Sequence, residues 1–173
     1  MKRHPGLQPL SRHHHFALVC ARELRRAAVA PAAEQAARLQ EAARTFLEFW
    51  RHDGKTHFRE EEEILLPAYA RATALEADAD VQRMLAQHEQ IRALADHLEA
   101  ALDSGTNLQP FAGELGQLLQ EHVRLEEETI FPRIEQTLGE TALREAGAQL
   151  TELHPRRSAS GKPLSPPPKK TAF

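Results

Sequence analysis

Cysteine and aromatic residues are scarce in this sequence. Of its 173 residues, one is cysteine, Cys20, and 5% are aromatic. A single cysteine can form neither an intrachain disulfide nor a thiolate metal cage, and its apolar surroundings favour a small buried side chain. No apolar run is long enough to span a bilayer, and the N-terminus lacks the apolar segment and cleavage site of a secretory signal. We therefore expect a cytoplasmic protein without a membrane partner.

Acidic residues are missing from the C-terminal segment. Residues 155–173 contain five Lys or Arg, no Asp or Glu, and much Pro, Ser and Gly. Such a composition buries too little apolar surface to offset chain entropy, so the segment is expected to be a disordered basic tail. Removing these five positive charges from the total of −3 leaves about −8 on the rest of the chain. This acidic body argues against nucleic acid as the main partner.

Strand-forming residues are also few. Ala, Leu, Glu, Arg and Gln dominate residues 7–152, and this composition predicts a single all-α domain. Prolines and a turn at 103–107 divide the domain into four helices, expected at about 9–29, 33–66, 79–103 and 108–131. Pro67 and Pro132 are expected to end the second and fourth helices, and short helical pieces follow through residue 152. Four amphipathic helices with short connections predict an up-down-up-down bundle.

Two stretches of the sequence repeat one another. They read HFREEEEILLP at 57–67 and HVRLEEETIFP at 122–132, and they share His, Arg, three Glu and Pro without gaps. A purely solvated run of charge has no reason to recur in register with its own histidine and proline. Each copy places a glutamate four residues after its histidine, as in His57 and Glu61, and in His122 and Glu126. The other glutamates of the first copy, residues 60, 62 and 63, are expected on the solvated surface.

The apolar stripe of each predicted helix contains a histidine. Steps of three or four residues place His57, His88 and His122 within the stripes of the second, third and fourth helices. The predicted inward positions of these helices also include Glu61 and Glu126, one turn after two of the histidines.

The first helix offers three consecutive histidines, residues 13 to 15. His14 is preferred because its neighbours at i+4 and i+7, Leu18 and Ala21, continue an apolar face. His13 is the closest alternative, whereas His15 has Arg22 at i+7.

Buried carboxylates and unpaired polar groups are costly, so four histidines and two glutamates in one core require a partner. Side chains at i and i+4 lie roughly 5–6 Å apart at Cβ and can converge on one metal ion. A dinuclear centre meets this need, and nitrogen and oxygen donors without thiolate suit iron, manganese or zinc. One inward histidine alone is more often a hydrogen-bonded core residue. The competing interpretation is therefore a metal-free helical interaction module.

The two repeats, together with AQHEQIRAL around His88, resemble the hemerythrin-like, or HHE, family of four-helix-bundle proteins over about residues 7–135. This resemblance implies a non-haem di-iron centre, oxo- or hydroxo-bridged, with terminal histidines and bridging carboxylates. It also implies a small ligand such as dioxygen or nitric oxide. The ligands carried over by motif are His14, His57, Glu61, His88, His122 and Glu126.

One position departs from the oxygen-carrying members of the family, which place a second histidine four residues after the first on the third helix. Here that position is Arg92, so one iron is expected to be less saturated or to take solvent or another carboxylate. The expected function shifts from reversible oxygen carriage to binding or sensing of O2, NO or redox state. The alternative is a di-iron enzyme or iron-handling protein that reduces peroxide or NO or repairs iron–sulfur centres. The sequence identifies no catalytic residue and no protein partner.

Overall fold

The computed structural model describes residues 3–153, and within this range all regular structure is helical. The first and third long segments are α1 (Gln8–Ala28) and α5 (Ala79–Ser104). The second segment is continuous through α2 (Ala32–Phe49), η1 (Trp50–Gly54), α3 (Lys55–Glu60), η2 (Glu61–Leu65) and α4 (Leu66–Ala70). The fourth segment runs through α6 (Gln109–Leu125), η4 (Glu126–Ile130) and α7 (Phe131–Thr137). The remaining elements are the short 3-10 helix η3 (Leu75–Ala77) and α8 (Glu140–Leu153).

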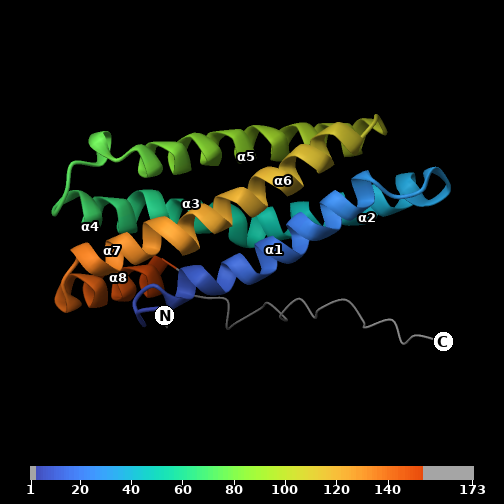
Figure 1. The fold of residues 1–173 in the computed structure, drawn as a ribbon. Coiled ribbons are helices and arrows are strands. Elements are labelled where there is room, and N and C mark those ends of the chain that lie inside the picture. The colour runs from blue at the N-terminus through green and yellow to red at the C-terminus, as the bar shows by residue number, and fades with distance from the viewer. Residues whose placement is uncertain (1–2, 154–173) are drawn as a thin grey trace.

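The four long segments alternate in direction and lie along one another, and α8 packs at the end where α1 begins (Figure 1). The all-α, up-down-up-down bundle predicted from the sequence is therefore confirmed, with α8 as a fifth helix. The predicted basic tail, residues 155–173, lies outside the described residues. Within residues 3–153, none of the helices has the length and hydropathy that crossing a bilayer requires.

Pro67 and Pro132 do not end their helices, and this part of the sequence-based prediction was wrong. Each proline falls in the first turn of a further α-helix, α4 or α7, directly after a π-helical turn. In the first turn of a helix the N–H groups need no intrahelical partner, so the missing N–H of proline is tolerated there. The π turns η2 and η4 begin at Glu61 and Glu126, and π turns occur often at functional sites.

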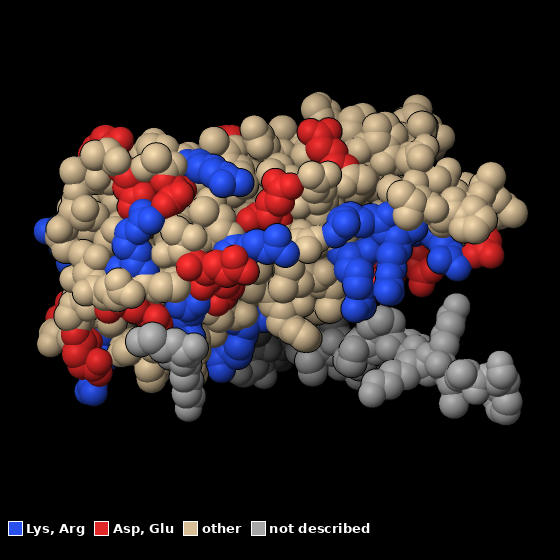
Figure 2. Space-filling model, viewed as in Figure 1, with Lys and Arg blue, Asp and Glu red and all other residues tan. Residues whose placement is uncertain are grey.

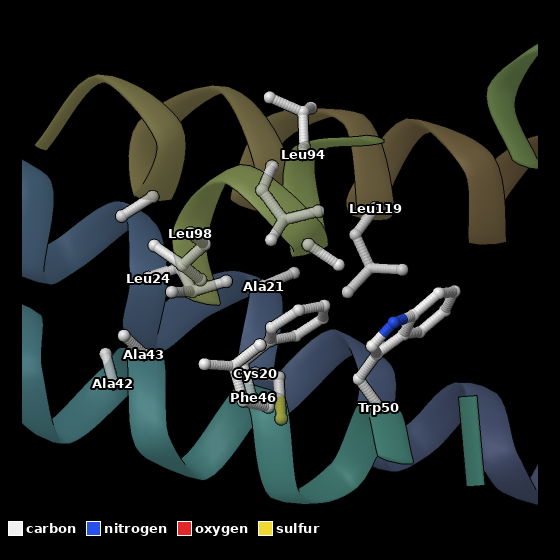
Figure 3. Close-up of a cluster of buried hydrophobic side chains, with 14 of the residues drawn as sticks. Cys20, Ala21, Leu24, Ala42, Ala43, Phe46, Trp50, Leu94, Leu98 and Leu119 are labelled. Atoms are coloured by element: carbon white, nitrogen blue, oxygen red, sulfur yellow. The ribbon is translucent and has the colours of Figure 1, made fainter. Parts of the chain in front are cut away.

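The buried apolar residues form two separate clusters. The larger one contains the bulky residues Phe46, Trp50, Leu98 and Leu119 and includes Cys20, as predicted (Figure 3). The second cluster lies toward the other end of the bundle, with members from α1, α4, α5, α7 and α8. In α1, for example, Leu10 belongs to the second cluster, Ala17 belongs to the first, and the buried His14 lies between them.

The start of α5 is fixed by Asp78, which is its N-cap residue. Its Oδ1 accepts hydrogen bonds from the backbone N–H groups of Asp80 and Val81, at 3.1 and 3.3 Å. Arg133 in α7 donates to both carboxylate oxygens of Asp78, at 2.7 and 2.8 Å. Asp78 therefore both caps α5 and ties it to the fourth helical segment.

Charged side chains of both signs are scattered over the face of the bundle seen in Figure 2, and basic ones gather near the end of α1. Arg22, Arg25 and Arg26 lie in this part of α1. Cations in the last turn of a helix interact favourably with its carbonyl end, so this basic group has a local structural reason.

Candidate metal centre

All six residues predicted as metal ligands are buried, and the structure brings them together between the two apolar clusters. Two overlapping groups have ligand atoms within 4.8 Å of one another. One group consists of His14, His57, Glu61 and Glu126, and the other of Glu61, His88, His122 and Glu126. The two glutamates thus belong to both groups. Each group also contains one histidine pair, which is His14 with His57 in the first group and His88 with His122 in the second.

Each carboxylate presents one oxygen to each histidine pair. Glu61 places Oε1 3.4 Å from His57 Nε2 and Oε2 3.3 Å from His88 Nε2. Glu126 places Oε2 3.0 Å from His14 Nε2 and Oε1 3.0 Å from His122 Nε2. Two cations, one beside each histidine pair, could therefore share both carboxylates.

Six buried side-chain atoms at the centre lack a hydrogen-bond partner. Among the described residues, this holds for both oxygens of Glu61, both oxygens of Glu126, and Nε2 of His88 and His122. Buried polar atoms of native proteins nearly always have a partner, and each exception calls for an explanation. Imidazole nitrogens and carboxylate oxygens are metal ligands, so a bound cation fits the donor atoms that are present.

Electrostatics also favours positive charge at the centre. Burial and the neighbouring Glu126 raise the pKa of Glu61 to about 8. Burial alone would lower the pKa of His14 and His88, but the adjacent carboxylates outweigh it and raise these pKa values to about 10 and about 11. Burial and the nearby His14 hold the pKa of His57 well below its usual value. Two buried carboxylates thus attract positive charge, which a cation can provide.

A second layer of residues binds the outer nitrogen of each histidine. His14 Nδ1 donates to Glu127 Oε1 at 2.6 Å, and His88 Nδ1 donates to Glu62 Oε1 at 2.6 Å. With a cation bound at the centre, these bonds would keep the proton of each ring on Nδ1 and leave Nε2 free to act as a ligand.

The remaining two histidines have outer partners of a different kind. His122 Nδ1 donates to Gln87 Oε1 at 3.3 Å, and His57 Nδ1 is hydrogen-bonded to His13 Nδ1 at 3.4 Å. Gln87 immediately precedes His88, and His13 immediately precedes His14. Each histidine pair with its outer partners forms one half of the centre, and the two halves are built alike.

The prediction that Glu60 and Glu62 are solvated surface residues was wrong. Glu60 is 1% exposed, because it ends α3 between His57 and Glu61, on a stretch of the segment that faces the bundle. Glu62 is partly buried by its bonds to His88 and Arg92. Glu63 is exposed as expected and pairs with Arg59.

Sequence reasoning missed Glu62 and Glu127 as outer partners, although the repeat contained the signal. They are the second of the three glutamates that the two copies share, and each directly follows Glu61 or Glu126. Gln87 had no comparable signal, because a single glutamine beside an inward histidine is not distinctive.

The first helix places His14, rather than His13 or His15, at the centre. His14 is 3% exposed and reaches Glu126, whereas His15 is exposed and His13 is directed toward Glu60. The reason given for preferring His14 was partly wrong, since Leu18 is 40% exposed. Ligation by His14 stays a prediction.

Arg92, four residues after His88, lies on the outer side of the centre. Its Nη2 donates to both oxygens of Glu62 at 2.8 Å, and its guanidinium lies 5.4 Å from the centre of the Phe58 ring. Arg92 thus orients the carboxylate that binds His88.

The chain belongs to a known class of metal-binding helical domains. A family model described as the hemerythrin HHE cation binding domain matches residues 7–134, which is most of the chain. The chain is therefore a member of this family, and its buried His and Glu groups suit a metal site. A search of curated proteins finds no match to this chain.

Proposed function

We propose that the domain binds two iron ions at this centre, and that the loaded centre binds or senses a small ligand such as O2 or NO. The observation that carries the proposal is the orientation of Glu61 and Glu126, each of which offers one oxygen to each histidine pair. A single cation would engage only one histidine pair and would leave the Nε2 atoms of the other pair without a metal to bind. Two cations satisfy all six side chains.

Iron is preferred because of the resemblance to the hemerythrin-like family. The donor set of nitrogen and carboxylate oxygen also suits manganese and zinc. A bound di-iron pair would supply redox-active positions at which a small ligand can bind. The chain itself supplies the histidines held in one tautomer, the two shared carboxylates and the exclusion of water.

Aromatic rings close the centre on two sides. Phe58 stacks on His88 with ring centroids 3.7 Å apart, and Phe131 stacks on His14 at 5.4 Å. Both phenylalanines are at most 2% exposed. An apolar, water-poor surrounding favours a small uncharged ligand such as O2 or NO over a hydrated ion.

The first experiment is the metal content per chain of protein purified in air, together with its visible spectrum before and after exposure to NO. Two irons per chain and a spectrum that changes with NO would support the proposal. Little metal, even after anaerobic reconstitution with iron, would contradict it and favour a metal-free interaction module. Turnover of peroxide or NO would instead support the alternative, an enzyme.

Matched variants test the assignment of the ligands. His57→Ala and His122→Ala should lose bound metal and melt at a lower temperature, because a ligand that binds only the folded state stabilises it. His52→Ala should do neither, since His52 is exposed on the same helical segment. Equal behaviour of all three variants would argue against a centre at His57 and His122.

A further inference from the structure

Two of the differences between the halves of the centre lie directly beside His57 and His122. In one half, the residues around His122 are Gln87 and Leu125. At the equivalent positions around His57, the chain has His13 and Glu60. Only the half around His57 therefore adds an imidazole and a carboxylate to the outer side of its histidine.

His13, His57 and Glu60 form a third group of possible ligand atoms. These atoms lie within 4.8 Å of one another. The distance between Nδ1 of His13 and Nδ1 of His57 is 3.4 Å, and His13 Nδ1 lies 3.8 Å from Glu60 Oε2. Ligands of a tetrahedral cation at about 2.0–2.1 Å lie roughly 3.3 Å apart, so the spacing is close to that required. At the centre, the distances from histidine Nε2 atoms to the carboxylate oxygens of Glu61 and Glu126 are similar, at 3.0 to 3.4 Å.

His13 brings the third group closer to solvent than the centre, although Glu60 and His57 are themselves buried. The His13 side chain is 17% exposed, whereas Glu61, His88, His122 and Glu126 are at most 1% exposed. His57 belongs to both the third group and the centre, with Nδ1 facing His13 and Nε2 facing Glu61. A cation held beside Nδ1 is thus one imidazole ring away from the centre.

We infer that His13, His57 and Glu60 form an outer site for a divalent cation, through which metal ions reach the buried centre. Glu60 supplies negative charge, His13 supplies a donor near solvent, and the ring of His57 connects the outer site to the centre. The inference rests on the proposed function, because it requires a centre that takes up metal.

The other half of the centre provides the variants for the test. His13→Gln and Glu60→Leu replace each residue by its counterpart, Gln87 or Leu125, so that an amide or an apolar side chain takes its place. The two substitutions lie on different helical segments, and either alone removes one ligand of the outer site. Control variants are His15→Gln and Glu63→Gln, which change exposed residues of the same helical segments.

The measurement is the rate at which metal-free protein takes up Co²⁺, followed by visible absorption, with the final Co²⁺ content per chain. His13→Gln keeps an outer hydrogen-bond partner for His57, as Gln87 is for His122. With Co²⁺ in excess, both variants should therefore reach the content of the unmodified protein but load about tenfold more slowly, because the outer site has lost one ligand, while the controls load at the unmodified rate. Loading at an unchanged rate by both variants would overturn the inference. So would a lower final content, because these residues would then belong to the centre. Failure of the unmodified protein to bind Co²⁺ would instead count against the proposed centre itself.

Discussion

Phe58 lies face to face with His88, with ring centroids 3.7 Å apart and an angle of 14° between the planes. Phe58 also makes edge-to-face contacts with His122 and Trp50, each with a centroid distance of 5.2 Å. One phenylalanine therefore joins two histidines of the centre to the larger apolar cluster. The packing of the core and the placement of the ligands depend on the same side chain.

Replacing Phe58 by Ala should destabilise the protein by about 3–5 kcal/mol, because it leaves a cavity beside two buried histidines. The free energy of unfolding, measured with urea at equal metal loading, tests this. Leu18→Ala is the control, since Leu18 is 40% exposed and its truncation should cost no more than about 0.5 kcal/mol. Similar losses in both variants would show that Phe58 is not part of a packed core.

Glu61→Ala should lose metal, because it removes a carboxylate shared by both histidine pairs. Glu62→Ala should retain the six ligands but bind metal about 10–100-fold more weakly, since His88 loses the partner that fixes its tautomer. Metal affinity measured by competition with a chelator distinguishes the two. A larger loss in Glu62→Ala than in Glu61→Ala would contradict the assignment of the bridging carboxylate.

Asp78 should make the protein sensitive to acid. Burial alone would raise its pKa, but the Arg133 guanidinium and the N–H groups of Val81 and Asp80 outweigh this and hold the pKa below its usual value. Because the carboxylate is favoured in the folded state, its contribution is fully present above about pH 4, the ordinary pKa of Asp, and is lost as the pH falls through the lowered value.

Asp78→Ala should therefore be less stable than the unmodified protein near neutral pH, by at least about 1 kcal/mol for the lost cap. The difference between the two proteins should shrink as the pH falls below about 4. Urea unfolding at a series of pH values measures it. A difference that stays constant into acid would show that the charge of Asp78 contributes nothing.

Gly116 allows α6 to approach α1 closely. A Cβ at this position would lie 2.7 Å from the carbonyl oxygen of Ala21, whereas at Gly113 it would meet only Ala28 Cβ at 3.5 Å. Gly113→Ala should therefore stabilise the helix by up to about 1 kcal/mol. Gly116→Ala should destabilise the protein by about 1–3 kcal/mol, because the helices must separate. Equal melting temperatures for the two variants would contradict a close crossing.

The helices and the inward faces of the centre could be predicted from the sequence, since both depend on spacing along one helix. The period of apolar residues and the repeated His and Glu positions carry that information locally. The π turns could not be predicted, because a change of hydrogen-bond partner leaves the composition unchanged. As a result, the sequence predicts helix ends at Pro67 and Pro132, whereas the structure has both prolines in the first turn of a further helix.

Contacts between helices were harder to predict. Glu62 and Glu60 sit beside Glu61 in one acidic run, yet one binds His88 from α5 and the other is buried near His13 from α1. Which neighbour each meets depends on how far the helices are rotated relative to one another, and spacing within one helix cannot supply that. Arg92 is a similar case, because its partner Glu62 belongs to a different segment.

The layer of histidines and glutamates separates two apolar clusters, and this has a consequence for how the molecule unfolds. Each cluster draws on several helices and could remain folded by itself for a time. The layer of histidines and glutamates connects the two clusters, and a cation bound to these side chains would hold both clusters together. With metal bound, the two clusters should unfold together in one cooperative transition. Without it, the end containing α8 should open first, and heat unfolding should broaden into two steps.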